Sequence, residues 1–149
     1  MMRRSVDIDL FIGAAALFVV AGGLVAAIAR PLDLTKGSWL AAYLVLVCGV
    51  ALAVIGAAQQ HTPSAVAPGV RIAQLGGWLV ANATVIVGSL VDSPAAVDVG
   101  AVLLLVVLLG TAWVGRGLAA SRRVAAYAYL AVLVVLAVSA PIGMILARR

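Results

Sequence analysis

The sequence predicts an all-α integral membrane protein that folds as a bundle of five transmembrane helices. Of its 149 residues, 66% are hydrophobic and 10% are charged, whereas soluble domains contain about 45–50% apolar and about 25% charged residues. The mean hydropathy is +1.25. The apolar residues gather in five runs close to the roughly 20 residues that a helix needs to cross a bilayer. We expect one transmembrane domain over residues 1–149.

The first run covers about residues 8–29 and follows Arg3 and Arg4. Residues 27–29 resemble a signal-peptide cleavage site, but the run is longer than the roughly 7–15 residues of a signal h-region. We therefore expect a retained transmembrane helix. The pairs at 22–23 and 26–27 are Gly-Gly and Ala-Ala, and such small residues let another helix backbone approach closely.

The second run covers about residues 39–59 and begins at Trp39, a residue type that favours the membrane interface. Gly49 and Gly56 lie at helical spacing and predict another smooth helix face. Pro63 follows, and the residue before a proline is pushed out of the α region. The helix is therefore expected to end before Pro63. The third run, about residues 71–91, is the most polar and the richest in glycine.

The fourth run covers about residues 99–114 and is almost entirely Val and Leu. This uniform surface predicts the helix most exposed to lipid. Residues 92–94 are expected to close the third helix, and Asp98 to open the fourth. The fifth run covers about residues 124–147 and ends on Arg148 and Arg149.

The net charge of +5 comes from residues at the ends of the apolar runs. There they orient helices and contact lipid phosphates, so we expect no nucleic-acid partner. With the N-terminus in the cytoplasm, the cytoplasmic side holds six cations: Arg3, Arg4, Arg71, Arg116, Arg122 and Arg123. The other side holds four: Arg30, Lys36, Arg148 and Arg149. The positive-inside rule favours this orientation. The Ala-, Val-, Leu- and Arg-rich composition indicates a bacterial protein of the inner (plasma) membrane.

Asn82 is the strongly polar side chain nearest the middle of an apolar run. An amide inside hydrocarbon costs free energy unless it is paired, so Asn82 is expected to face other helices. It either contacts a ligand or ion, or forms a helix–helix hydrogen bond with Thr84, Gln74 or a neighbouring hydroxyl. We favour the structural interpretation, and these three residues are the candidate intramembrane polar site.

His61 is the one candidate metal ligand, at the end of the second run. A structural zinc site needs four ligands and a catalytic site needs three and a water. The chain has one His, one Cys and no Glu, so we expect no metal and no other cofactor. No nucleophile–base pair or phosphate-binding loop is visible, and the five Asp residues lie near the ends of the runs. We therefore expect no catalytic residue and no enzyme.

A pattern of aromatic, glycine and polar residues extends across the second and third runs. It consists of Trp39, Tyr43, Leu44, Gly49, Gly56, Gln59, His61, Pro63, Arg71, Gln74, Asn82 and Gly88. This pattern resembles short membrane proteins related to haem-copper oxidase subunit I and to the nitric-oxide-response membrane family. The resemblance implies a histidine ligand near Tyr43, where this chain has tyrosine. From this resemblance we therefore expect the same helical scaffold but no bound haem.

Two classes of function are consistent with these features. The first is a non-enzymatic scaffold or accessory subunit, a degenerate haem-copper-like helical module that packs against other membrane subunits or against copies of itself. The second is a small transporter or channel subunit that works as an oligomer, with Asn82, Thr84 and Gln74 along its path.

Overall fold

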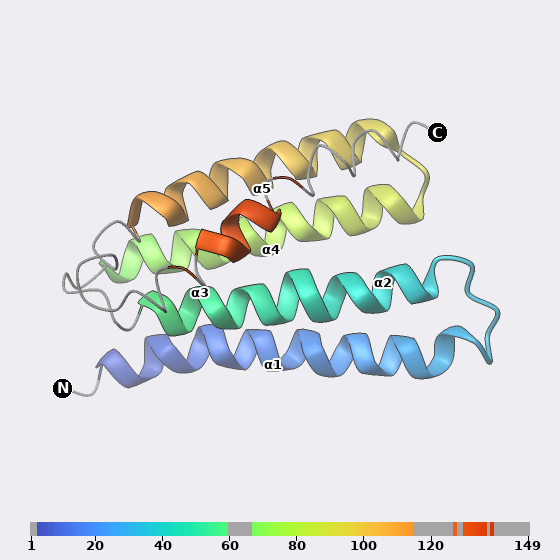
Figure 1. Ribbon diagram of the computed structural model, residues 1–149, viewed down its shortest axis with the longest axis horizontal. Coiled ribbons are helices and arrows are strands. Elements are labelled where there is room, and N and C mark those ends of the chain that lie inside the picture. The colour runs from blue at the N-terminus through green and yellow to red at the C-terminus, as the bar shows by residue number, and fades with distance from the viewer. Residues whose placement is uncertain (1–2, 60–66, 115–126, 128–129, 137, 139–149) are drawn as a thin grey trace. The chain divides into compact units, whose positions relative to one another are not determined.

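The computed structural model describes residues 3–59, 67–114, 127, 130–136 and 138 (Figure 1). These residues lie in helices or in the loops between them, and none of them is in a strand. The helices in chain order are α1 (Arg3–Ala29), α2 (Gly37–Tyr43), the π-helix η1 (Leu44–Ala51), α3 (Leu52–Gln59), α4 (Pro68–Leu90) and α5 (Pro94–Val114). Because α2, η1 and α3 follow one another without a break, they form one continuous rod.

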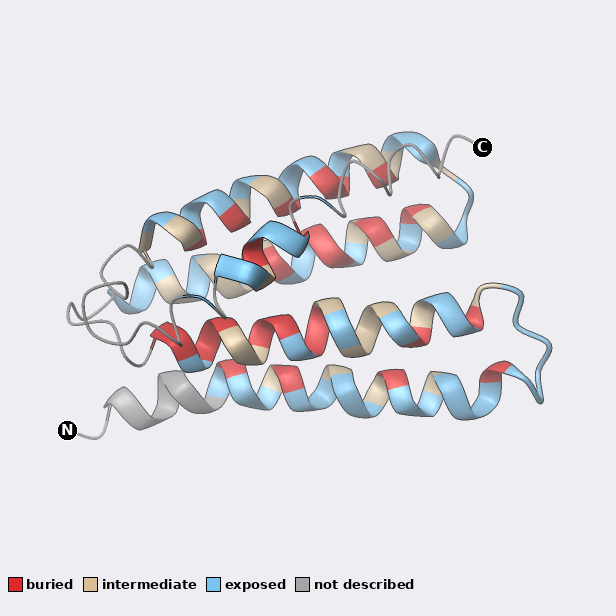
Figure 2. Cartoon of the chain, in the orientation of Figure 1, coloured by how far each residue is buried: buried red, intermediate tan, exposed pale blue. Residues whose placement is uncertain are grey.

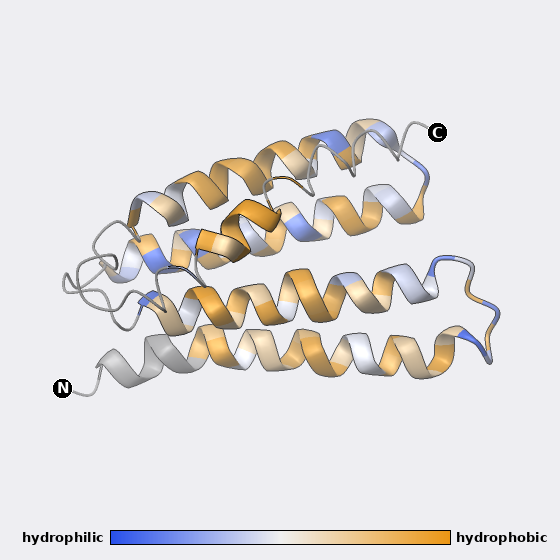
Figure 3. Cartoon of the chain, viewed as in Figure 1, coloured by the Kyte–Doolittle hydropathy of each residue, from blue (hydrophilic) through white to orange (hydrophobic). Residues whose placement is uncertain are grey.

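Four segments of the described chain are long and apolar enough to cross a membrane. They are Leu10–Ala29, Gly37–Gln59, Pro68–Leu90 and Pro94–Val114. Apolar residues dominate them, as Figure 3 shows. The predicted all-α class is thus confirmed for the described residues. The predicted fifth helix, residues 124–147, lies largely outside them, although its residues 130–136 are helical. The count of five membrane-spanning helices stays a prediction.

The second and third helices begin and end within three residues of the predicted positions, but the first and fourth begin earlier. Helix α1 starts at Arg3, so Asp7 and Asp9 lie inside it. Helix α5 starts at Pro94 rather than at residue 99. Proline is favoured at the first helical position for two reasons. An N–H at that position would have no partner within the helix, and the φ angle of proline is already helical. Asp98 therefore lies within α5 and is half-buried.

The chain divides into two compact units, Met1–Gln60 and His61–Arg149. In the first unit, α1 packs antiparallel against the rod of α2, η1 and α3. In the second unit, α4 packs antiparallel against α5. Whether both units belong to one transmembrane domain stays a prediction.

One side of α1 forms its contact with the rod (Figure 2). The positions on this side recur every three or four residues, as in a heptad seam. Those that are buried are Phe11, Ala15, Gly22 and Ala29, and Phe18 and Val25 between them are half-buried. At Gly22 the backbones come so close that an added Cβ would lie 2.9 Å from the carbonyl oxygen of Ala41. A side chain at this position would separate the two helices.

The π-helix η1 keeps the small residues of the rod on the side that faces α1. Ala41 and Gly49 are eight residues apart, and Gly49 and Gly56 are seven. In an α-helix, seven residues return to within about 20° of the same side, whereas eight turn about 80° away. All three nevertheless contact α1, at Gly22, Ala15 and Phe11 respectively. Since a π-helix has more residues per turn, η1 absorbs the additional residue.

In the second unit, α4 and α5 also meet at glycines. A Cβ on Gly100 would lie 2.7 Å from the backbone nitrogen of Val85 and 3.0 Å from the carbonyl oxygen of Ala81. A Cβ on Gly88 would lie 2.8 Å from the backbone nitrogen of Val97. Such close backbone contact is the usual role of small residues between membrane helices.

Helix α5 is not the most exposed of the four spans, contrary to the prediction. In the most apolar stretch of α5, 33% of the residues are buried, compared with 17% in that of the first span. One side of α5 is buried, and it consists of Val97, Gly100, Ala101, Leu104, Leu108 and Thr111. Because Val and Leu occupy both sides of α5, hydropathy does not distinguish the buried side, which is marked by its small residues.

Both helical hairpins turn at an aspartate in the left-handed backbone region. The φ angle is 50° at Asp33 and 53° at Asp92, and aspartate is among the residues that tolerate this region. The N–H of Leu34 donates to the oxygen of Ala29 at 2.9 Å, and the N–H of Ser93 to that of Gly88 at 2.8 Å. These are the six-residue bonds of the Schellman motif, which satisfy carbonyls at a helix end.

We expect Gly100→Ala to destabilise the second unit, because its Cβ would meet the backbone of α4. Overpacking of this kind costs about 1–3 kcal/mol. Gly110→Ala is the matched control on the same helix, since no atom of the described residues outside the neighbouring α5 backbone lies within 4 Å of its added Cβ. Thermal unfolding in detergent measures both. Equal melting temperatures for the two variants would contradict the packing of α4 on α5.

Candidate functional site

Asn82 lies in the middle of α4 and is 1% exposed. Its Nδ2 donates a hydrogen bond of 2.8 Å to the carbonyl oxygen of Trp78, one turn earlier in the same helix. The prediction that Asn82 is buried is thus confirmed. This bond lies within α4, because the carbonyl one turn back is the acceptor nearest to a short polar side chain in a helix. A helix–helix bond of Asn82 stays a prediction.

The structure does not bring Asn82, Thr84 and Gln74 together on one face. Asn82 and Thr84 are two residues apart, and such residues point to different sides of an α-helix. The Thr84 hydroxyl donates to the carbonyl oxygen of Val80 at 2.7 Å. Gln74, two turns before Asn82, is half-buried and lies nearer to the Asn82 side. A site built on α4 would therefore include Asn82 and Gln74 but leave Thr84 on the other side.

A polar stripe along α4 was not recognised from the sequence. Its members recur at spacings of three, four or seven residues and are Arg71, Gln74, Trp78, Asn82 and Ser89. Trp78 is 2% exposed, and its indole Nε1 has no hydrogen-bond partner among the residues that the structure describes. The spacing alone could have revealed the stripe, but tryptophan is counted among the hydrophobic residues, so Trp78 was not considered a polar residue.

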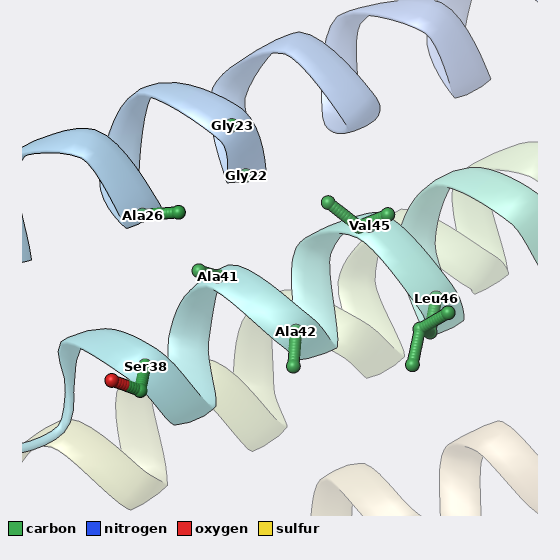
Figure 4. Close-up of a pocket in the computed structure, with 8 residues that line it drawn as sticks. All are labelled: Gly22, Gly23, Ala26, Ser38, Ala41, Ala42, Val45 and Leu46. Carbon is green, nitrogen blue, oxygen red and sulfur yellow. The ribbon is translucent and has the colours of Figure 1, made fainter.

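The first unit carries an open groove of about 420 Å³ between α1 and the rod (Figure 4). Its lining consists of small and aliphatic residues together with one hydroxyl: Gly22, Gly23, Ala26, Ser38, Ala41, Ala42, Val45 and Leu46. The side chains of Ala26, Ala41 and Val45 point into the space between the helices. The groove is thus an apolar surface with one polar group, Ser38, near the turn that joins α1 to α2.

The candidate metal ligand His61 lies outside the described residues. Cys48 is a buried, free cysteine within η1. In the part of the chain that the structure describes, no group of three His, Cys, Asp or Glu residues is placed to hold a metal ion. Tyr43 lies at the end of α2, where its ring stacks on that of Trp39 with centroids 5.3 Å apart.

Comparison with known protein families, with curated proteins and with solved structures finds no match to this chain. The resemblance to proteins related to haem-copper oxidase subunit I stays a prediction that rests on residue spacing.

We expect Asn82→Leu to destabilise the protein more than Asn82→Ala. Both remove the bond to Trp78, and a typical intramolecular hydrogen bond contributes about 0.5–1.5 kcal/mol. The branched leucine also overpacks a buried position, which costs about 1–3 kcal/mol more. Melting temperatures of the purified variants in detergent provide the measurement. Should neither variant melt below wild type, Asn82 is not a structural residue and its ligand-binding interpretation gains.

Proposed function

We propose that this chain is a multi-pass protein of the inner (plasma) membrane of a bacterium, with its N-terminus in the cytoplasm. It acts as a non-enzymatic scaffold or accessory subunit of a larger membrane complex. A degenerate haem-copper-like helical module is one form that such a subunit takes.

The membrane location is supported by large apolar side chains that remain exposed along the helices. Leu17 is 73% exposed on α1, and Leu109 is 71% exposed on α5. A large contiguous apolar surface is unusual on a soluble protein and typical of a membrane or protein contact. Exposure of these side chains to lipid tails costs no free energy, because the tails are equally apolar.

The observation that carries the scaffold proposal is a second seam on α1, in which four of the five residues are Gly or Ala. Like the buried side of this helix, it follows heptad spacing, but all its members are exposed: Gly13, Ala16, Val20, Gly23 and Ala27. Among the described residues, no atom outside the neighbouring backbone of α1 lies within 4 Å of a Cβ added to Gly13 or Gly23. Helix association in membranes relies on such seams, because lipid tails are as apolar as the helices. The seam fits a transmembrane helix of a partner subunit.

The orientation leads to a topology prediction. A reporter fused after Ala67, before α4, should face the cytoplasm, and one fused after Ser93, beyond α4, should face outward. Green fluorescent protein should therefore fluoresce at the first position, and alkaline phosphatase should be active at the second. Activity of the same reporter at both positions would show that α4 does not cross the membrane.

The scaffold proposal predicts that Ala16→Leu disrupts a native complex. In mild-detergent extracts of native membranes, the wild-type chain should migrate with other membrane proteins, well above its own 15.0 kDa. Ala16→Leu should shift it to the free form, since a bulky side chain blocks close approach of a partner helix. Native electrophoresis with mass spectrometry of the excised band measures both.

Ala83→Leu is the matched control, because Ala83 is also exposed but lies on α4, outside the seam. Migration of the wild-type chain alone would overturn the proposal. So would a complex that survives Ala16→Leu as well as it survives Ala83→Leu.

A small transporter or channel subunit that works as an oligomer is the second candidate. It is favoured by the polar stripe of α4, where the buried Trp78 and Asn82 lie one turn apart. Polar side chains within membrane helices mark substrate or ion paths in many transporters. A liposome flux that is lost in both Asn82→Leu and Asn82→Ala, without loss of stability, would move this candidate ahead.

A further inference from the structure

The groove between α1 and α2 opens beside the cationic turn of the first hairpin. Arg30 follows Ala26 by four residues, about one helical turn, and is exposed. Lys36 precedes Ser38 by two residues and is half-buried. Asp33 lies between the two cations, so the turn has a net charge of +1. The turn of the second hairpin, residues 91–93, carries Asp92 and no cation.

An apolar groove and a cationic turn meet here at one end of the predicted membrane spans. The groove's volume of about 420 Å³ lies within the range of small-molecule sites, roughly 300–1,000 Å³. Its walls are aliphatic apart from the Ser38 hydroxyl, which lies toward the turn. An occupant that matches this surface has a long apolar chain and a polar, anionic end.

We propose that the groove binds one anionic phospholipid. One acyl chain lies against Ala26, Ala42 and Leu46, and the phosphate lies at the turn, near Arg30 and Lys36, with the Ser38 hydroxyl available as a donor. Basic residues at the end of a membrane helix attract anionic headgroups. Because most of the lining residues are Gly or Ala, the acyl chain can lie close to both helices. This proposal goes beyond the scaffold function and does not depend on it.

Native mass spectrometry of the full-length protein tests the proposal, with phosphatidylglycerol or phosphatidylcholine added to the detergent-purified chain. Wild type should retain one phosphatidylglycerol, with an affinity about tenfold higher than for phosphatidylcholine, as expected for two cations near the phosphate. The double variant Arg30→Gln, Lys36→Gln should bind both lipids with similar affinity. Arg4→Gln, at the other end of α1, should keep the wild-type preference.

Ala42→Leu tests the acyl-chain contact, since Ala42 is exposed and a longer side chain there fills the groove without entering the α1 contact. It should lower the affinity for both lipids about tenfold. Ala16→Leu, on the exposed seam of α1, should bind lipid as wild type does. For native complexes the scaffold proposal predicts the reverse: Ala16→Leu disrupts the complex and Ala42→Leu does not. The two proposals can therefore fail separately.

Three results would overturn the lipid site: equal affinity of wild type for the two lipids, unchanged affinity in Ala42→Leu, or a wild-type dimer that Ala42→Leu converts to monomer. The last would assign the groove to a helix of a second copy. If Ala42→Leu does not fold, the headgroup preference of the Arg30→Gln, Lys36→Gln variant decides alone.

Discussion

Both helical hairpins depend on direct contact between helix backbones at positions that lack a side chain. Gly22 against Ala41 and Gly100 against Val85 are close enough that an added methyl group would overlap backbone atoms. Apolar side chains give little preference for a neighbouring helix over lipid, so the attraction between the helices comes from close packing. The spacing of small residues therefore decides which sides of the helices meet, and the remaining apolar surface is left for lipid or for partners.

The same small residues also produce the groove of the first unit. Gly22 lies in the contact with the rod, whereas a Cβ placed on its neighbour Gly23 would meet no atom of the rod within 4 Å. Ala41 and Ala42 differ in the same way, since the first is buried and the second exposed. Each pair of adjacent small residues thus forms a tight contact on one side and leaves a hollow beside it. A hollow of this origin changes little when side chains rotate, because its floor is formed largely by backbone and methyl groups.

Much of the helical framework could be predicted from the sequence, because apolar runs of membrane length determine where helices form. The second and third runs match the structure closely, and the early start of α5 follows from a signal that was missed, Pro94 at the first helical position. The buried side of α5 could not be predicted from hydropathy, since Leu104 is buried and Leu109 is exposed.

For the candidate site, the burial of Asn82 could be predicted from the free-energy cost of an amide in hydrocarbon. Its bond to the Trp78 carbonyl, in the backbone of its own helix, depends on local geometry. The π-helix escaped notice because no residue type marks it; the eight-residue step from Ala41 to Gly49 is its only sign in the sequence.

The π-helix has a consequence for how this chain tolerates changes in its length. Removing one residue between Leu44 and Cys48 would bring the step between Ala41 and Gly49 to seven, the value that a regular α-helix accommodates. The parts of the rod before and after η1 would then keep their present sides toward α1. The same deletion within α4 has no such reserve, and it would turn everything beyond it by about 100°. A deletion of a single residue can therefore be absorbed between Leu44 and Cys48, whereas a deletion within α4 would disrupt its contact with α5.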